Sequence, residues 1–426
     1  MRTYLKDYKP IILPMSDTLT LVKKNSFYQN VVLEVLSKMT KGHLFLTLPD
    51  GEGVSIGTGE GNISARISIN DEAFYKRIIL YGDIGFGEAY VDGLWDTDNI
   101  TNVIKWVLLN IENAPGVSGS KARSVALNLL KFFNKVYNSK RANTLTGSRK
   151  NISEHYDLNN DFFASFLDPT MTYSAAYFYK EGLSLEEAQY AKYERLCRQL
   201  HLQPTDHVLE IGSGWGGNAI YMAKNYGCKV TSLTISEEQL KMARERVAAE
   251  GLSDRVEILM KDYRQMEGQF DKLVSVEMLE AVGHKYLDGY FKRCHEMLKP
   301  NGILAIQVIT SPDSRYNSLR KGVDWIQKHI FPGSLLPSVG AINASVNRTG
   351  DFTLVDLKDL GIDYATTLKL WHQQFNASLQ KVRVLGFDDR FIRKWNYYLC
   401  YCEAAFAMRN INVMHLVYSR PNNTER

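Results

Sequence analysis

The stretch Val208-Leu-Glu-Ile-Gly-Ser-Gly-Trp-Gly-Gly217 runs from an apolar segment directly into a glycine-rich turn. The residues that follow it, 218–224, have helical character. Gly212, Gly214 and Gly216 allow the backbone to turn tightly and to approach a ligand closely, while the amides at the start of the helix point toward that ligand. The pattern predicts a nucleotide-binding strand, turn and helix.

The acidic residues around this turn distinguish two classes of nucleotide cofactor. In dinucleotide-binding folds, an acidic residue about 20 positions further on holds the ribose. The second predicted strand, 228–235, ends without such a residue, and Glu210 instead lies inside the first strand. This arrangement disfavours NAD and favours S-adenosylmethionine, with Thr234 and Gln239 as polar contacts to its ribose.

Length and composition limit the class of protein. The chain has 426 residues, 45% hydrophobic and 23% charged, so we expect a soluble protein of two domains. Its net charge of +4 gives no support for a nucleic acid partner. The five cysteines include no CxxC pair, so neither a disulfide framework nor a zinc site is indicated, and a reducing cytoplasm fits. No apolar stretch approaches the ~20 residues of a spanning helix, so we expect any membrane contact to be peripheral.

The first 150 residues are expected to form a separate region. Residues 1–112 have the patterns of a small mixed α+β domain and contain no catalytic constellation. Residues 113–120 have the composition of a linker. The segment 121–150 contains eight Lys or Arg residues and no acidic residue, and its first half has apolar side chains at helical spacing. Such a basic amphipathic helix can lie on an anionic bilayer; the alternative is a helix that packs on the catalytic domain.

From residue 151 onward, predicted strands and helices alternate. Apolar segments at 256–260, 273–276 and 303–308 are typical of buried strands, and a helix is expected to begin near Ser236. Alternation of this kind predicts a mostly parallel sheet covered on both faces, with ligands beyond the carboxyl ends of its strands. The sequence therefore predicts a Rossmann-like α/β domain of the class I methyltransferase type at 151–426.

Several polar and aromatic residues are candidates for chemistry at these strand ends. Tyr263 follows the third strand, where an adenine would lie; the alternative is a packing residue. Glu277 and Glu280 would share a helical face, and burying a carboxylate among their apolar neighbours is costly, which indicates function. The alternative for both acids is a solvated surface turn. The aromatic segment 168–178 predicts either a pocket that stabilises a cation or ordinary core, and Cys402 either a nucleophile or an inert packing residue.

Several segments in order along the chain resemble the cyclopropane-fatty-acyl-phospholipid synthases and together cover nearly the whole sequence. They are 85–95, 155–157, 163–178, 212–217, 233–239 and 331–338. The resemblance implies methyl transfer from S-adenosylmethionine to the cis double bond of an unsaturated phospholipid acyl chain, through a carbocation that loses a proton and closes to a ring. It also implies a homodimer, a lipid-binding or dimerisation role for 1–112, and a cytoplasmic enzyme bound peripherally to the inner face of the membrane.

The resemblance also assigns cofactor contacts to this chain. The matching positions are Tyr173, Ser174, Leu209, Glu210, Ile211, Gly212, Ser213, Gly214, Trp215, Gly216, Gly217, Thr234, Ile235, Ser236, Glu237, Glu238, Gln239, Tyr263 and Arg264.

A bicarbonate acting as the base is the second small molecule that the resemblance implies. The matching catalytic positions are Ala175, Glu280, Gln307, Ile309, Tyr364 and, as a candidate active-site thiol, Cys402. The family commonly has Cys where this chain has Ala175 and His where it has Gln307, and loss of the imidazole is expected to weaken anion binding. Two alternatives are a relative that makes a methyl-branched chain and a lipid-binding relative without catalysis.

Overall fold

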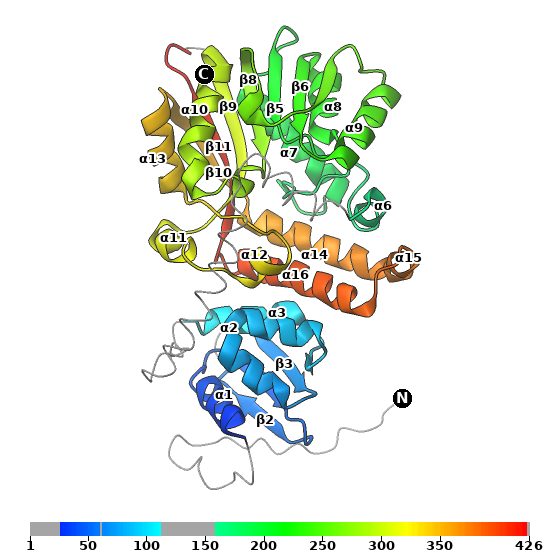
Figure 1. Ribbon diagram of the computed structural model, residues 1–426, viewed down its shortest axis with the longest axis vertical. Coiled ribbons are helices and arrows are strands. Elements are labelled where there is room, and N and C mark those ends of the chain that lie inside the picture. The colour runs from blue at the N-terminus through cyan, green and yellow to red at the C-terminus, as the bar shows by residue number, and fades with distance from the viewer. Residues whose placement is uncertain (1–25, 60–61, 112–157, 424–426) are drawn as a thin grey trace. The chain divides into compact units, whose positions relative to one another are not determined.

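The computed structural model describes residues 26–59, 62–111 and 158–423, which fall into two compact units (Figure 1). The N-terminal unit contains the described residues up to 111 together with 389–408, and the larger unit contains the rest. The predicted linker and basic segment lie outside the described residues, as does the motif at 155–157. Within the described ranges, no helix is long and apolar enough to span a membrane.

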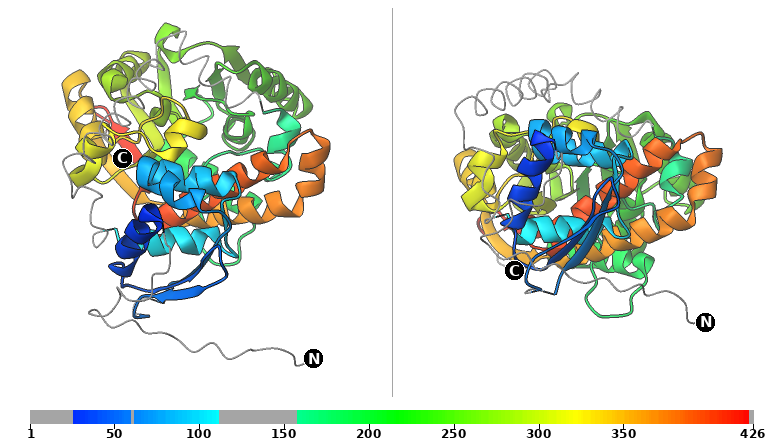
Figure 2. Two further views of the ribbon diagram at one scale, coloured as in Figure 1. Left: turned by 60° about the horizontal axis from the view of Figure 1, so that its bottom comes forward. Right: turned by 90° about the horizontal axis from the view of Figure 1, so that it is seen from below.

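Among its described residues, the N-terminal unit consists of a small mixed sheet and four helices, as the sequence predicted for a mixed α+β domain. The strand order is β2-β1-β3-β4, in which β1 is antiparallel to β2 and parallel to β3. Exposed and buried side chains alternate along β3, so one face of the sheet packs on the core. Figure 2 shows the blue strands beside the cyan helix α3, which contacts β1 and β3. The elements are α1 (Phe27–Ser37), β1 (His43–Thr47), β2 (Gly53–Ile56), β3 (Ser64–Ile69), α2 (Ala73–Val91), β4 (Trp95–Asp96), α3 (Ile100–Leu109) and α16 (Asp389–Ala407).

Helix α16 departs from the domain boundary expected from the sequence, which placed it within 151–426. The structure groups it with the N-terminal unit because its partners are there. Arg393 donates hydrogen bonds to the Tyr90 carbonyl at 2.7 Å and the Trp95 carbonyl at 3.0 Å, and its guanidinium lies 4.1 Å from the centre of the Tyr90 ring. Thr101 of α3 donates to Glu403 at 2.9 Å. Cys402, one of the candidate residues, therefore belongs to the N-terminal unit.

A seven-stranded sheet forms the centre of the larger unit. Its order is β10-β11-β9-β8-β5-β6-β7, and β11 is the strand that runs antiparallel to both of its neighbours. The predicted mostly parallel sheet is confirmed, with all five predicted strands present; β10 and β11 were not predicted. The strands are β5 (His207–Ile211), β6 (Lys229–Thr234), β7 (Val256–Met260), β8 (Phe270–Val276), β9 (Leu298–Thr310), β10 (Thr353–Asp359) and β11 (Asn412–Ser419).

Helices cover both faces of this sheet, as the buried strands require. Val208 packs with side chains of α7 (Leu185–Leu200), α8 (Gly217–Tyr226) and α9 (Glu237–Ala249) in one core cluster. Its neighbour Leu209 points to the opposite face and packs with α10 (Leu287–Met297) and α13 (Val339–Thr349). The other α-helices in the part of this unit that the structure describes are α6 (Asn160–Phe163), α11 (Asp313–Leu319), α12 (Trp325–His329), α14 (Gly361–Ala377) and α15 (Leu379–Val384).

Candidate active site

The glycine turn joins β5 to α8 and lies at the carboxyl end of the sheet. The amides of Gly212 and Ser213 both donate to the Leu233 carbonyl, at 3.1 and 2.8 Å, which ties the turn to β6. Gly214 has a φ of 50°, and a Cβ placed there would meet no atom within 4 Å. Gly217 is closely surrounded instead, since a Cβ would lie 2.7 Å from Tyr193 Oη. The open side of the turn at Gly214 fits the close approach of a nucleotide.

Glu210 stabilises this turn through hydrogen bonds made inside the sheet. Its Oε1 accepts from Asn218 Nδ2 at 2.8 Å, and its Oε2 accepts from the Ser232 hydroxyl. Burial raises the pKa of Glu210 to about 7, although these hydrogen bonds and Lys192 oppose the shift. The carboxyl therefore connects β5, β6 and the first turn of α8.

The ends of the next two strands present the polar residues expected there. Ser236 caps α9 by accepting from the Gln239 amide at 3.3 Å, and Thr234 Oγ1 donates to Gln239 Oε1 at 2.9 Å. After β7, Asp262 accepts from Arg264 Nε at 2.8 Å, and the Arg264 guanidinium lies 5.6 Å from the Tyr263 ring centre. These residues lie at the strand ends where the sequence predicted cofactor contacts.

An aromatic cluster surrounds Tyr173. Its ring centre lies 5.2 Å from that of Phe163 and 5.2 Å from that of Trp371 in α14, while Phe163 also lies 5.0 Å from Trp215 of the glycine turn. Trp215 Nε1 donates to Asn160 at 2.7 Å. The aromatic segment at 168–178 thus connects to the turn through Phe163, and its ring faces are suited to a cation such as a sulfonium.

Glu277 is a site residue that the site assignment from the sequence left out. It follows β8 with a φ of 47°, and its amide donates to the Gln307 carbonyl at 2.8 Å. Its carboxylate accepts from the Ala175 amide, from Gln307 Nε2 and from Tyr364 Oη. Glu277 thus brings together three of the six predicted catalytic positions.

Glu280, the predicted acid, lies in a 3₁₀ turn at Leu279–Ala281 and is 8% exposed, so the solvated-turn alternative does not describe it. Its Oε1 accepts a short hydrogen bond from the Ile309 amide, and its Oε2 has no hydrogen-bond partner among the described residues. Burial, followed by the charge of Glu277, raises the pKa of Glu280 to about 8. The two acids that share this segment therefore have very different environments.

Lys192 is a site residue that the sequence did not reveal. It lies on α7 with no exposed surface, and its Nζ donates to Ser174 Oγ at 2.6 Å. Burial lowers the pKa of Lys192 to about 7, opposed by the charges of Glu277, Asp168 and Glu210. The only signal in the sequence was a lysine on the apolar side of an amphipathic helix, which tertiary contacts alone turn into a buried cation.

The two groups of residues meet at one edge of the sheet. A Cβ on Gly212 would lie 3.6 Å from the Met278 side chain, so the glycine turn contacts the segment that contains both acids. Ser275 Oγ also donates to the Ile211 carbonyl at 3.1 Å. An electrophile held on the turn would therefore lie beside the segment that contains Glu277 and Glu280.

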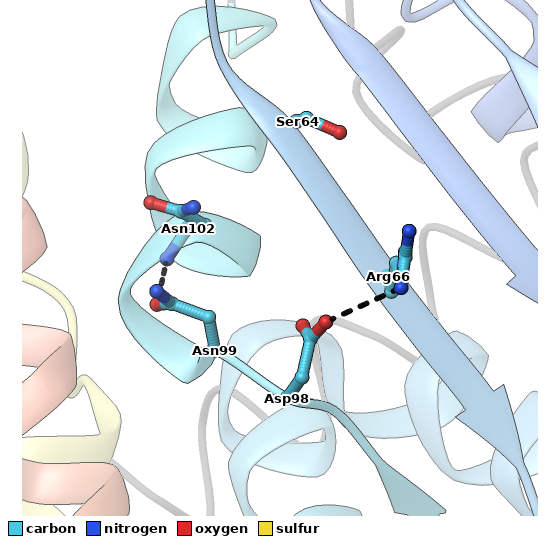
Figure 3. Close-up of a pocket in the computed structure, with 5 residues that line it drawn as sticks. All are labelled: Ser64, Arg66, Asp98, Asn99 and Asn102. Carbon is cyan, nitrogen blue, oxygen red and sulfur yellow. Dashed lines mark hydrogen bonds and ion pairs between the residues drawn. The ribbon is translucent and has the colours of Figure 1, made fainter. Parts of the chain in front are cut away.

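The N-terminal unit contains a polar hollow of its own (Figure 3). Arg66 and Asp98 approach to 3.8 Å across it, and the Asn102 amide donates to Asn99 at the start of α3. Both charged side chains are well exposed, and Asn99 acts as a helix cap. The hollow is explained by capping and a surface ion pair.

The sheet order, the glycine turn and the polar strand ends define the class I fold of S-adenosylmethionine-dependent methyltransferases. A solved structure of coclaurine N-methyltransferase with S-adenosylhomocysteine shares this fold with a TM-score of 0.60 at 16% identity, covering 79% of this chain and 99% of that one. The mycolic acid cyclopropane synthase CmaA1, solved with S-adenosylhomocysteine and CTAB, has a TM-score of 0.58 at 29% identity and covers 64% of this chain and 98% of that one.

Sequence comparisons narrow the class to a family. The model of the mycolic acid cyclopropane synthetase family matches residues 143–416. The cyclopropane-fatty-acyl-phospholipid synthase of Escherichia coli K12 is 40% identical over 84% of this chain and 89% of its own length. The tuberculostearic acid methyltransferase UfaA1 of Mycobacterium tuberculosis is 39% identical over 89% of this chain and 88% of its own length. The chain belongs to the mycolic acid cyclopropane synthetase family and is an S-adenosylmethionine-dependent methyltransferase, which confirms the resemblance.

Proposed function

We propose that this enzyme transfers a methyl group from S-adenosylmethionine to the cis double bond of an unsaturated phospholipid acyl chain and forms a cyclopropane ring. The observation that carries the proposal is the contact between the glycine turn and the segment with Glu277 and Glu280. A proton must leave after methyl transfer, and this edge of the sheet has acids within an apolar, aromatic surrounding. The name of the relative in Escherichia coli, at 40% identity, supports the substrate class.

The cofactor supplies an electrophilic methyl group on a sulfonium when it is bound. The open turn at Gly214 fits its close approach, and Thr234, Gln239, Tyr263 and Arg264 lie at the strand ends for its ribose and adenine. In this proposal the remaining assigned positions between 209 and 239, with Tyr173 and Ser174, form the walls of that site. The alkene has no polar handle, so the aromatic cluster positions it by apolar contact and stabilises developing positive charge.

The lipid is proposed to reach this site from a membrane surface. Residues 1–112 lack a catalytic constellation, and the basic segment 121–150 has the charge to attract anionic lipid. In this proposal the enzyme acts as a homodimer on the inner face of the cytoplasmic membrane, and the N-terminal region binds lipid or joins two subunits.

A methyl-branched acyl chain without a ring is the second candidate product. UfaA1, which is named as a methyltransferase, matches this chain at almost the same identity as the cyclopropane synthase. Both reactions pass through the same carbocation and differ in which proton it loses. Ala175 and Gln307, where the chain departs from the family pattern, lie beside the acids that would accept that proton.

The test combines binding with product analysis. Calorimetric titration should show binding of S-adenosylmethionine and its demethylated product. Incubation with vesicles of unsaturated phosphatidylglycerol should then yield lipid heavier by one methylene unit, with ring-specific NMR signals. Binding without any lipid product would contradict the proposed function and favour a non-catalytic relative, whereas a heavier lipid without ring signals would favour the methyl-substituted chain.

A further inference from the structure

Glu277 engages the hydrogen-bond donors that the family resemblance assigns to a bicarbonate. Its Oε1 accepts from the Ala175 amide at 2.8 Å and from Gln307 Nε2 at 2.7 Å, and its Oε2 accepts from Tyr364 Oη at 3.0 Å. The three donors come from the segment before α7, from β9 and from α14. A carboxylate that belongs to the chain itself therefore holds this donor set.

A second layer of hydrogen bonds fixes the direction of the Gln307 amide. Gln307 Oε1 lies 2.6 Å from Nε2 of His415 on β11, and Gln307 Nε2 also donates to the Ala175 carbonyl at 3.1 Å. Burial, followed by the charges of Arg195 and Lys192, holds the pKa of His415 well below its usual range, so its ring is neutral. With Gln307 Oε1 as the acceptor, Nε2 of His415 must carry the proton, and the Gln307 amino group must face Glu277.

The charges around Glu277 leave little room for another anion. Burial raises the pKa of Glu277, and the hydrogen bonds from Ala175, Gln307 and Tyr364 and the charge of Lys192 oppose this shift. At Glu280, the charge of Glu277 adds to the effect of burial and raises the pKa further. Ile309, the remaining donor assigned to the bicarbonate, already donates to Glu280. A bicarbonate would have to displace both carboxylates from their donors and then sit beside them, so the residues present do not fit this ion.

The backbone conformation at Glu277 suits glycine better than glutamate, so the glutamate side chain is not there for the sake of the turn. Its φ of 47° lies in the left-handed region, which glycine adopts more easily than glutamate. A strained conformation of this kind is kept where a side chain is needed in one place. Here the strain directs the Glu277 carboxylate toward Ala175, Gln307 and Tyr364.

We propose that the Glu277 carboxylate replaces bicarbonate as the proton acceptor of the reaction, an inference that rests on the proposed function. The alkene π pair forms the new bond to the methyl carbon, and the bond from that carbon to sulfur breaks with its electron pair left on sulfur. Glu277 then takes a proton from the new methyl group, and the C–H pair closes the ring onto the cationic carbon. The protonated Glu277 later releases this proton to water.

Two substitutions at position 277 test the proposal in the full-length protein. Glu277→Gln keeps the size and polarity of the side chain, but an amide does not accept a proton near neutral pH. We therefore expect turnover to fall by ~10²-fold or more. Glu277→Gly suits the left-handed backbone and leaves Ala175, Gln307 and Tyr364 open to a small anion. We therefore expect added sodium bicarbonate or formate to restore its activity ~10-fold, and not that of Glu277→Gln.

Binding of [¹³C]bicarbonate, followed by NMR, is the readout that does not depend on turnover. We expect binding to Glu277→Gly and none to the wild-type protein, whose turnover should be unchanged in carbon-dioxide-depleted buffer. Glu194→Gln is the matched control, because Glu194 also accepts from several donors, including Tyr221 at 2.9 Å and Tyr226 at 3.0 Å, but lies away from the site.

The inference is overturned if the wild-type protein binds bicarbonate or needs it, if Glu277→Gln stays active, or if Glu277→Gly neither binds nor responds to the anions. Failure of the proposed function has a different signature. In that case the wild-type protein gives no lipid product with any vesicle, while the difference in bicarbonate binding between wild type and Glu277→Gly still decides the role of Glu277 as the resident anion.

Discussion

Glu277 and Glu280 are three residues apart on one segment, yet the structure gives them opposite surroundings. Glu277 accepts three hydrogen bonds and lies near a buried lysine, whereas Glu280 accepts one hydrogen bond at its side chain and has an oxygen without a partner among the described residues. Two carboxyl groups with different environments can hold different protonation states at one pH. Burial raises the pKa of both carboxyl groups, but hydrogen bonds and the charge of Lys192 oppose the shift at Glu277, whereas the charge of Glu277 adds to it at Glu280.

The pH dependence of stability tests the neutral state of Glu280. Burial raises its pKa from 4.5 to about 8, so between these values the folded protein keeps a proton that the unfolded chain has lost. The stability contributed by this group is therefore present below pH 4.5 and decreases as the pH rises toward 8. We expect the free energy of unfolding of wild type, relative to Glu280→Gln, to fall by roughly 3–4 kcal/mol between pH 5 and pH 8.

Chemical denaturation of both proteins across this pH range gives the measurement. Glu194→Gln is again the control, because hydrogen bonds from Arg198, Tyr221 and Tyr226 outweigh burial and hold the pKa of Glu194 below its usual range. Its difference from wild type should therefore not decline between pH 5 and pH 8. A flat difference for Glu280→Gln as well would mean that Glu280 is ionised in the folded protein.

At the scale of elements, two glycines of the glycine turn have different roles: Gly214 leaves space for a ligand, and Gly217 allows close packing. A Cβ at Gly217 would lie 2.7 Å from Tyr193 Oη and 2.9 Å from the Thr170 carbonyl oxygen, whereas a Cβ at Gly214 would point into open space. Both positions belong to one strand–turn–helix, but a side chain at Gly217 would disturb the fold and one at Gly214 would obstruct a ligand. The substitution that reports on cofactor binding is therefore the one at Gly214.

We expect Gly214→Val to lower the affinity for S-adenosylhomocysteine at least ~10²-fold, because the side chain prevents close backbone approach. Calorimetric titration measures this loss. Gly251→Val is matched to it, since Gly251 also has a positive φ and open surroundings but lies after α9. Both variants should lose similar thermal stability, and only Gly214→Val should lose binding. Equal affinities in the two variants would contradict the assignment of the turn to the cofactor.

At the scale of the whole molecule, the proposed membrane contact depends on the basic segment outside the described residues. Charge reversal at Lys131, Lys135 and Lys140 should weaken binding to vesicles that contain phosphatidylglycerol, since each cation contributes ~1 kcal/mol near an anionic surface. Vesicle sedimentation at low and high salt provides the measurement, with neutral phosphatidylcholine vesicles as the control. Vesicle binding that is unchanged by both the substitutions and the salt concentration would favour a helix that packs on the catalytic domain.

The sequence by itself determined the parts of this protein that depend on local order. Apolar runs and glycines at fixed spacing predicted β5, the turn and α8, and the Ser236 cap marked the start of α9, because backbone conformation and capping are set by neighbouring residues. Repeated strands and helices predicted the parallel sheet, and motifs in order indicated the family, which the comparisons confirmed.

Only the tertiary structure decided what depends on contacts between distant segments. β10 and β11 have a place in the sheet only through pairing with each other and with β9, and α16 belongs with the N-terminal unit because its partners lie between residues 90 and 101. The same holds for the chemistry of the site. Glu277 and Lys192 acquire their properties from burial and from donors up to 102 residues away along the chain, and no local pattern records desolvation or the approach of such donors.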